Sequence, residues 1–329
     1  MIFFFDNHKF IFSIPLDSLN HQKYIEDLCL KEGFTKVGFA KTEELDKEAI
    51  ELKEWLEAGY GADMKWMNNS YEKRINSSQI NPRIRSVISL AYLYDTPVPH
   101  PNEKNIPYIS RYAWGKRDYH KVIKKKLKSI VAELEINFPV NYFRYYVDDG
   151  PVMDKVWAVR AGLGWMGKNT TVINPDFGSF FFIANIFTDL EFSYAEPIED
   201  KCKSCTVCLT ECPTGAIFEE YKLDANKCIS YQTIENRCET LPDEINLKGW
   251  VFGCDICQDV CPFNQNNFFT TDDNFFPRET IVNKTYDDFL SLSEEQFNSL
   301  FEGTPVRRAK YKGFIRNLRK AKSEQTNLP

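Results

Sequence analysis

Two segments near the start of the chain repeat apolar residues with the period of a helix. The first covers residues 24–32 and is followed by Gly33; the second covers residues 43–58 and is followed by Gly59. An amphipathic period that stops at a glycine predicts a helix that ends there. Two later segments show a helical pattern, residues 119–137 and 152–161.

Four shorter segments are apolar enough to be strands, and they lie between or beside the predicted helices. They cover residues 35–40, 87–94, 142–147 and 179–187. Helices and strands that alternate along a chain indicate an α/β or α+β fold. We therefore expect one α/β (α+β) domain over residues 21–196, with residues 1–20 as an extension upstream of it.

The placement of cysteine changes the picture after residue 196. Nine of the ten cysteines lie between Cys202 and Cys261. They are arranged as Cys202-x2-Cys205-x2-Cys208-x3-Cys212-Pro213, then Cys228 and Cys238, then Cys254-x2-Cys257-x3-Cys261-Pro262. This spacing is the signature of bacterial ferredoxins with two 4Fe-4S clusters. We expect a ferredoxin-like domain over residues 197–269 and a short, basic, helical C-terminal tail over residues 270–329.

The ligands of each cluster follow from the same signature. In two-cluster ferredoxins the last cysteine of a run binds the other cluster. One cluster is therefore assigned to Cys202, Cys205, Cys208 and Cys261, and the other to Cys212, Cys228, Cys254 and Cys257. Cys238 is left over and is predicted to be dispensable, and Cys29 is predicted to be a buried structural thiol.

Zinc and disulfides are the alternative uses of these cysteines. Zinc sites favour two separated pairs with a longer loop between them, unlike these runs. Disulfides need an oxidising compartment. Residues 1–20 lack the basic start and unbroken apolar run of a signal peptide, and no stretch reaches the roughly 20 apolar residues of a membrane span. We therefore expect a cytoplasmic protein without a membrane partner.

Charge limits how the chain could meet a nucleic acid. The 329 residues carry a formal net charge of −6, so a polyanion would have to bind at a local basic patch. Two candidate patches are present, Lys121, Lys124, Lys125, Lys126 and Lys128 in the first, and Arg307, Arg308, Lys310, Lys312, Arg316, Arg319, Lys320 and Lys322 in the second. For either patch alone, a solvated helix face is the favoured interpretation.

The first domain lacks the common nucleotide-binding motifs. No Gly-x-Gly-x-x-Gly opens a helix after a strand at the required spacing, and no Walker loop is present. The glycine-rich segment 161–169 comes nearest, and it could bring backbone close to a large ligand while Lys168 met a phosphate or carboxylate. A tight turn explains that segment equally well.

Several motifs together resemble those of the epoxyqueuosine reductases, a family of cobalamin- and iron–sulfur-dependent enzymes of tRNA queuosine biosynthesis. The resemblance runs from about Tyr24 to Asn317. Besides both cysteine runs and the segment 162–169, it includes Gly59-Tyr60-Gly61-Ala62-Asp63-Met64, Arg111-Tyr112-Ala113-Trp114-Gly115, Val147-Asp148-Asp149-Gly150-Pro151 and Gly303-Thr304-Pro305-Val306-Arg307-Arg308.

The resemblance implies the chemistry of the first domain. That domain would bind cobalamin, electrons would pass through the two clusters to cobalt, and epoxyqueuosine at the wobble position of tRNA would be reduced to queuosine. Asp148 matches the proton donor of the family. The residues that match cobalamin-binding positions are Arg74, Ser110, Arg111, His120, Asp148, Lys168, Asn169 and Ser230.

The resemblance also implies partners. The substrate would be the anticodon stem-loop of a tRNA carrying epoxyqueuosine, the electrons would come from an external donor such as a flavodoxin or ferredoxin system, and we expect a monomer. One departure is that residues 115–118 are one residue longer than the usual Gly-x-Asp, which affects how His120 is presented. Many relatives continue into helical repeats that bind tRNA, and this sequence stops before them.

Three alternatives stay open at this point. A corrinoid and iron–sulfur reductase could act on a small molecule, as the reductive dehalogenases do, although those enzymes typically carry an export signal. A plain electron-transfer ferredoxin module would bind no corrinoid. Asp148 and Asp149 could simply cap the helix predicted near Val152, a common role for aspartate.

Overall fold

A four-stranded antiparallel sheet forms the centre of the first domain. The computed structural model describes residues 18–265 and 268–326, so residues 1–17 of the predicted extension lie outside the described residues. The strand order is β1-β2-β7-β4, every neighbouring pair is antiparallel, and the strands are β1 (Lys36–Lys41), β2 (Ser86–Leu93), β7 (Phe181–Thr188) and β4 (Phe143–Tyr146). These are the four predicted strands, and their pairing makes the domain α+β.

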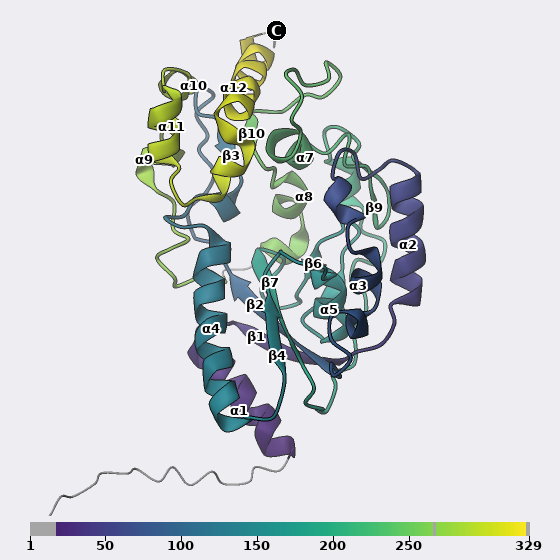
Figure 1. Ribbon diagram of the computed structural model, residues 1–329. Coiled ribbons are helices and arrows are strands. Elements are labelled where there is room, and N and C mark those ends of the chain that lie inside the picture. The colour runs from purple at the N-terminus through teal and green to yellow at the C-terminus, as the bar shows by residue number, and fades with distance from the viewer. Residues whose placement is uncertain (1–17, 266–267, 327–329) are drawn as a thin grey trace, which may run out of the picture.

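Helices cover both faces of this sheet (Figure 1). Helices α1 (Ser18–Lys31) and α4 (Tyr119–Asn137) cover one face, and α5 (Asp154–Arg160) packs on the other. Strand β2 shows why, because its side chains alternate between two apolar cores: Ile88 and Leu90 pack with α4, whereas Val87 and Ala91 face the α5 side. This central strand is therefore buried along its whole length, including its two serines.

Strand β1 and helix α5 approach each other very closely. At Gly38 a Cβ atom would lie 2.0 Å from the carbonyl oxygen of Ala161, so only glycine fits there. This contact fixes the C-terminal end of α5 against the sheet, and the glycine-rich segment 162–169 begins directly after it. Helix α2 (Asp46–Glu57), helix α3 (Tyr71–Ile75) and the 3-10 turns η1 (Lys65–Met67) and η2 (Ser77–Gln79) lie between β1 and β2 in the chain.

The cysteine-rich region consists of short elements joined by turns. They are α6 (Val207–Thr210), β8 (Ile217–Glu219), β9 (Lys222–Leu223), α7 (Ile229–Ile234), β10 (Trp250–Phe252), α8 (Ile256–Asp259) and η4 (Pro262–Asn264). The short strands β5 (Trp165–Met166) and β6 (Val172–Ile173) precede this region in the chain and pack against Cys261. Strand β10 pairs in parallel with β3 (Tyr108–Ile109), which η3 (Arg111–Ala113) follows. That pairing joins the cysteine-rich region to the first domain.

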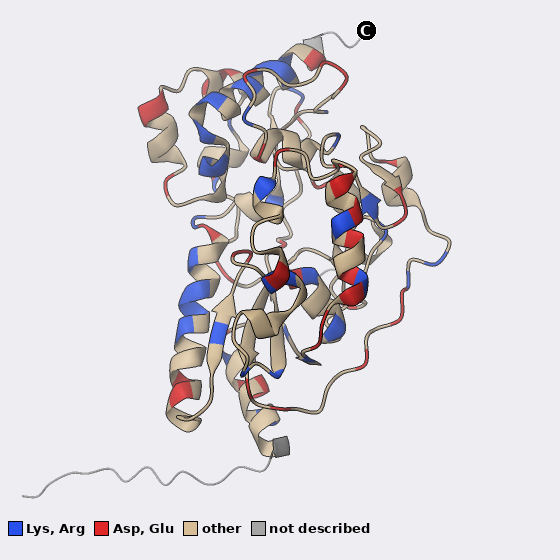
Figure 2. Ribbon diagram, turned by 45° about the vertical axis from the view of Figure 1, so that its right-hand side comes forward, with Lys and Arg blue, Asp and Glu red and all other residues tan. Residues whose placement is uncertain are grey.

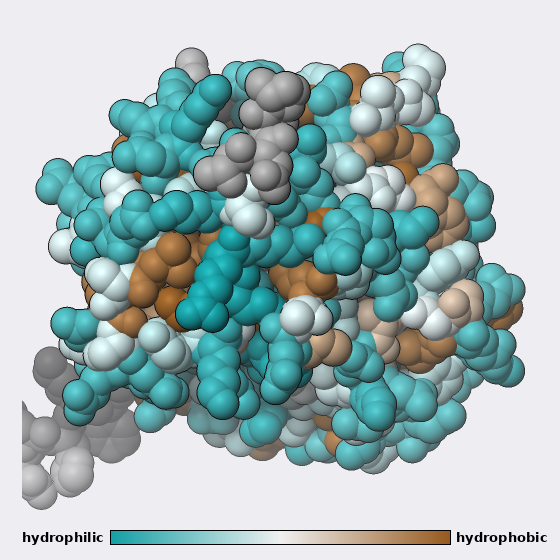
Figure 3. Space-filling view, turned by 90° about the horizontal axis from the view of Figure 1, so that it is seen from above, coloured by the Kyte–Doolittle hydropathy of each residue, from teal (hydrophilic) through white to brown (hydrophobic). Residues whose placement is uncertain are grey.

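The C-terminal helices build a second apolar core. They are α9 (Glu279–Val282), α10 (Tyr286–Leu290), α11 (Glu294–Leu300), η5 (Pro305–Ala309) and α12 (Lys310–Thr326). Phe289, Phe301 and Phe314 pack together, and Trp250 of β10 belongs to the same core. Seen from above, the surface is mostly hydrophilic, with apolar side chains in separate small areas (Figure 3). Because Trp250 belongs to this core, the predicted helical tail packs onto the cysteine-rich region.

Candidate active site

Asp148 lies in a tight turn directly after β4. Its backbone φ is +50°, and Gly150 two residues later has φ +75°. The left-handed region is uncommon for residues other than glycine, although aspartate tolerates it better than most. Strained backbone of this kind is often found at functional sites. The turn directs the Asp148 side chain outward, where 68% of it stays exposed.

The first turn of α4 supplies the partners of Asp148. The hydroxyl of Tyr119 donates a short hydrogen bond to Oδ2 of Asp148, and Nε2 of His120 lies 3.8 Å from the same oxygen. Asp118 caps α4 by accepting the backbone N–H of His120 at 2.9 Å. The start of α4 thus places a phenol and an imidazole beside one carboxylate.

Asp118 also sets the charge state of His120. Its Oδ1 lies 2.7 Å from Nδ1 of His120. Burial by itself lowers the pKa of His120, but the hydrogen bond and charge of Asp118, with a contribution from Asp148, outweigh it and raise the pKa above its ordinary value. The neighbouring carboxylates thus stabilise the imidazolium form of His120 relative to an isolated histidine.

The capping alternative for the two aspartates fails. The N-cap residue of α5 is Met153, and no side chain caps that helix. Asp149 instead accepts the backbone N–H of Val147 at 3.0 Å and pairs with Lys124 at 2.7 Å. The turn at residues 147–150 is held by Asp149, which leaves Asp148 free for its contacts with α4.

Two ionisable residues at the start of α5 lie near Asp148. Burial, and then the charge of Asp148, raise the pKa of Asp154 to about 8, so Asp154 keeps a proton at neutral pH. Asn185 donates a 2.7 Å hydrogen bond to it. Lys155 donates to the carbonyl oxygen of Thr170 at 2.8 Å, and burial lowers its pKa.

Lys155 connects the aspartate side of the site to the cysteines. The charges that favour its protonated form are, in order, Asp148, Cys257, Asp154 and Cys228. Its side chain remains accessible to water even though surrounding protein desolvates the amine. Lys155 is therefore close enough to Asp148 and to Cys228 and Cys257 for all three to influence its amine.

Arg74 lies on the same side of the protein. Its guanidinium donates to the carbonyl oxygen of Val152 at 3.3 Å and lies 5.9 Å from the ring centroid of Trp66. Its Nε is buried without a hydrogen-bond partner among the described residues. A buried, unpartnered donor of this kind is free to bind a polar group of a ligand.

Several of the predicted ligand cysteines lie close enough to raise one another's pKa values. Burial, followed by Cys202, Cys261 and Cys205, raises the pKa of the Cys208 thiol to about 11. Burial also raises the pKa of Cys257, and the charges that add to it come first from Cys228 and Cys212. The pKa of Cys254 rises for the same reasons, with Cys228 and Cys257 as neighbours.

These groupings fit iron–sulfur clusters. Thiolates gathered in a buried place repel one another, and bound iron removes that repulsion. All ten cysteines are free thiols. Within the described ranges, no three His, Cys, Asp or Glu side chains are gathered closely enough to hold a metal ion on their own. Cys29 is fully buried, as predicted, whereas Cys238 is exposed.

The segment 162–169 lies between the two cysteine runs. Lys168 donates to the carbonyl oxygen of Lys203 at 2.5 Å and pairs with Glu220 at 2.7 Å. Asn169 donates to the carbonyl oxygen of Cys257 at 3.1 Å. Trp165 donates to the sulfur of Cys202 at 3.4 Å. The segment therefore joins the first run to the second, and the amine of Lys168 is already occupied.

Ser110 and Arg111 are held by acids of the second run. Asp255 accepts a short hydrogen bond from the Ser110 hydroxyl and a 2.8 Å hydrogen bond from the backbone N–H of Arg111. The Arg111 guanidinium also pairs with Asp259, and His100 lies 3.2 Å from Asp255. Burial raises the pKa of Asp255, but His100 and Arg111 outweigh burial and hold it below its ordinary value.

This network was not predicted from the sequence. Asp255 and Asp259 sit between the ligand cysteines, and that position was the one available signal. Ser230, another predicted position, lies in α7 two residues after Cys228, and its backbone N–H supports that thiolate. The structure thus brings Arg74, His120 and Asp148 to one side of the site, whereas Lys168, Asn169, Ser110 and Arg111 contact the cysteine runs.

Comparison with known proteins identifies the family. Residues 201–264 match the family model for a 4Fe-4S double cluster binding domain, and residues 74–149 match the model for epoxyqueuosine reductase QueG, DUF1730. The epoxyqueuosine reductase of Synechocystis sp. is 46% identical over 270 residues, which cover 81% of this chain and 92% of that protein. The chain belongs to the epoxyqueuosine reductase family.

Solved structures of epoxyqueuosine reductases have the same fold. A crystal structure of one with an epoxyqueuosine-modified tRNA-Tyr stem loop is 28% identical, with a TM-score of 0.86 over 93% of this chain and 82% of that one. The Bacillus subtilis enzyme, solved with its catalytic aspartate loop swung out of the active site, is 27% identical, with a TM-score of 0.83 over the same shares. The predicted fold class is therefore confirmed, and no described helix is long and apolar enough to cross a membrane.

Proposed function

We propose that this chain reduces epoxyqueuosine at the wobble position of tRNA to queuosine. The observation that carries the proposal is the position of Lys155, which is close enough to both Asp148 and the cysteines Cys228 and Cys257 for all of them to influence its pKa. The proposed proton donor and two cysteines of one predicted cluster are thus neighbours of the same lysine, as an enzyme that couples proton and electron transfer requires. Membership of the family supports the choice of substrate.

The residues present fit the cofactors of the family. The two cysteine groups fit two 4Fe-4S clusters, with Cys202, Cys205, Cys208 and Cys261 on one and Cys212, Cys228, Cys254 and Cys257 on the other. The unpartnered Nε of Arg74 and the accessible Lys155 fit polar groups at the edge of a large ligand such as cobalamin. When bound, cobalamin would supply the electrons that open the epoxide.

Asp148 acts as the proton donor in this proposal. The reaction takes up two electrons and two protons, breaks the carbon–oxygen bonds of the epoxide and releases its oxygen as water. In its protonated form Asp148 donates to the departing oxygen from its exposed carboxyl group and becomes the carboxylate, and the hydroxyl of Tyr119 fixes the orientation of that group. His120 lies at 3.8 Å, and protonated Asp154 holds a further proton nearby.

The other predicted positions have distinct roles. We assign Arg74 and His120 to direct contact with cobalamin or substrate. Ser110, Arg111, Lys168, Asn169 and Ser230 hold the loops that carry the cysteines, and any contact they make with cobalamin comes in addition to that role.

The substrate enters, in this proposal, past a pocket of about 470 Å³ lined by Trp66, Arg237, Arg307, Arg308 and Lys310, among others. Asp148 contributes to the electrostatics of Arg308, which places that pocket near the proton donor. Arg316 of the basic tail is not available for RNA, because it donates to three backbone carbonyl oxygens in residues 232–238. We further propose a cytoplasmic monomer that receives electrons from a flavodoxin or ferredoxin system.

The test is a reconstituted reaction. Protein loaded with iron, sulfide and cobalamin is incubated with a chemical reductant and an anticodon stem-loop that carries epoxyqueuosine, and the nucleosides are separated by chromatography with mass detection. The proposal predicts conversion to queuosine that depends on cobalamin. A protein that carries both clusters and cobalamin but leaves epoxyqueuosine unchanged would contradict it.

A further inference from the structure

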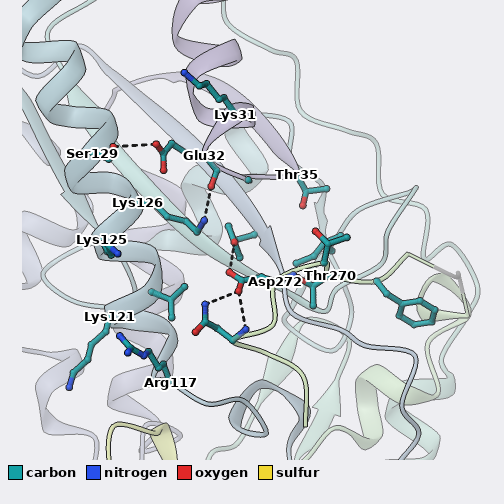
Figure 4. Close-up of a pocket in the computed structure, with 17 residues that line it drawn as sticks. Lys31, Glu32, Thr35, Arg117, Lys121, Lys125, Lys126, Ser129, Thr270 and Asp272 are labelled. Atoms are coloured by element: carbon teal, nitrogen blue, oxygen red, sulfur yellow. Dashed lines mark hydrogen bonds between the residues drawn. The ribbon is translucent and has the colours of Figure 1, made fainter. Parts of the chain in front are cut away.

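A basic pocket lies beside the active site, behind the first turns of α4. Its volume is about 660 Å³, and it is lined by the end of α1 and the turn that follows it, the end of β2, α4 with the preceding Arg117, and residues in the range 269–274 (Figure 4). Arg117 and Lys121 lie together at one end, and Lys31 lies at the other. The charged residues of the lining are Lys31, Arg117, Lys121, Lys125, Lys126, Glu32 and Asp272.

The two acids of this pocket are satisfied from within. Glu32 accepts the hydroxyl of Ser129 at 3.2 Å. Asp272 accepts the hydroxyl of Tyr92 at 2.7 Å and both the backbone and side-chain N–H groups of Asn274. Burial raises the pKa of Asp272, but these bonds and Lys126 outweigh it, so the carboxylate stays ionised. Neither carboxylate therefore neutralises an exposed cation of the pocket.

Most of the cations are free to meet a ligand. Lys126 is held, because its amine donates to the carbonyl oxygen of Glu32 at 2.8 Å and lies over the ring of Tyr92. Lys31, Arg117, Lys121 and Lys125 are exposed, and none of them forms an ion pair with another described residue. Figure 2 shows basic residues following one another along α4. The pocket therefore presents unneutralised positive charge to solvent.

The pocket adjoins the proposed catalytic residues. Arg117 directly precedes Asp118, the cap of α4, and Lys121 is the next residue after His120. A substrate that reaches Asp148 at the start of α4 is therefore one helical turn from this row of cations. Lys121 and Lys125 are four residues apart and stand about 6 Å from each other along the helix axis.

We propose that this pocket binds backbone phosphates of the tRNA outside the nucleotide that is modified. The inference rests on the proposed function, and it deepens that function by naming where the polyanion is held. Free cations in a row next to the substrate site suit a chain of phosphates, whose contacts fix register without reading sequence. The side chain of Thr35, which also lines the pocket, adds a hydroxyl donor to the same surface.

An acidic electron-donor protein is the competing ligand, and the structure favours RNA. Electrons must enter near a cysteine, and none of the residues that line the pocket is a cysteine. The turn of α4 that borders the pocket instead carries the partners of Asp148.

The experiment compares two double variants of the iron- and cobalamin-loaded protein. Lys31→Gln with Lys125→Gln removes one cation from each of the two helices that line the pocket. Lys47→Gln with Lys53→Gln is the matched control, since both lysines are exposed on α2, on the other side of the protein (Figure 1). Binding of fluorescently labelled tRNA is measured by anisotropy between 0.05 and about 0.5 M salt.

The expected effect follows from counterion release. Each phosphate contact contributes about 0.7 to 0.9 to the slope of log affinity against log salt. The pocket variant should therefore show a slope shallower by about 1.4 to 1.8 and roughly 25- to 60-fold weaker binding at about 0.1 M salt. The α2 control should bind like the parent, and the variant's rate at saturating tRNA should be unchanged.

Two results would overturn the proposal. Equal affinity and slope in the pocket variant and the parent would show that no phosphate is held there. Normal tRNA binding combined with slower reduction by flavodoxin would make the pocket a docking site for the donor. If the parent itself fails to bind tRNA, the proposed function fails. If the parent binds tRNA and the pocket variant binds equally well, only the phosphate site fails.

Discussion

Asp255 is the buried centre of the network that ties the second cysteine run to the first domain. Its carboxylate accepts hydrogen bonds from Ser110 and Arg111 and contacts His100, and 1% of its side chain is exposed. Asp259 also pairs with Arg111 but keeps 31% of its side chain exposed. We therefore compare Asp255→Ala with Asp259→Ala, two variants that remove the same chemical group from sites of different burial.

The difference in burial sets the magnitude. Removing one partner from a buried ionic network costs about 3–5 kcal/mol, because the remaining charge stays buried and unpaired. A partly exposed pair contributes about 0–1 kcal/mol. At roughly 2–4 °C per kcal/mol for domains of about 150–250 residues, Tm should fall by about 6–20 °C for Asp255→Ala and by at most about 4 °C for Asp259→Ala.

The assay is thermal unfolding of the iron-loaded protein, followed by circular dichroism at one fixed scan rate. Iron content is measured on the same samples, because loss of a cluster would lower Tm by another route. Asp255→Ala with full iron and a large fall in Tm is the expected result. If the two variants melt within about 2 °C of each other, which is less than about 1 kcal/mol, the network contributes little and the reasoning from burial is wrong.

Three further predictions concern the site. Asp148→Asn should lower kcat by about 10²–10⁴-fold, the usual contribution of a proton donor. Tm and the electron paramagnetic resonance of the clusters should stay as in the parent, because asparagine tolerates the left-handed backbone at this turn. An unchanged kcat would remove Asp148 from the mechanism. Asp118→Asn should lower the pKa of His120, since Asp118 is what raises that pKa against burial. The imidazole titration seen by NMR and the alkaline limb of kcat should therefore both move to lower pH. A shift to higher pH would show that Asp118 does not stabilise the protonated imidazole. Cys228→Ala should reduce iron content, whereas Cys238→Ala should not, and equal iron loss in the two would reject the assignment of Cys228.

The sheet could be predicted because its strands carry their own signal. β2 is mostly apolar because both of its faces are covered. α4 has the ends that its helical pattern predicts, and Asp118 caps its start. α1 begins at Ser18, six residues before the predicted start. Its first residues therefore lie in the segment that was expected to be an extension. The cysteine spacing is similarly local, and so was predictable.

Contacts between distant segments could not be predicted. Ser110 and Asp255 are 145 residues apart, and nothing in either segment specifies the other. Lys155 appears in the sequence as one more polar position of a helix, and only the packing of α5 brings it near Cys228 and Cys257. The amine of Lys168 was expected to be available for a ligand, but a backbone carbonyl and Glu220 occupy it.

The most direct test of the central claim is the nucleoside content of bulk tRNA in a strain that lacks this gene and contains no second reductase of this kind. The account predicts that epoxyqueuosine accumulates in the deletion, that the restored gene converts it to queuosine, and that the Asp148→Asn allele does not. Normal queuosine in the deletion strain, measured by mass spectrometry, would contradict the account.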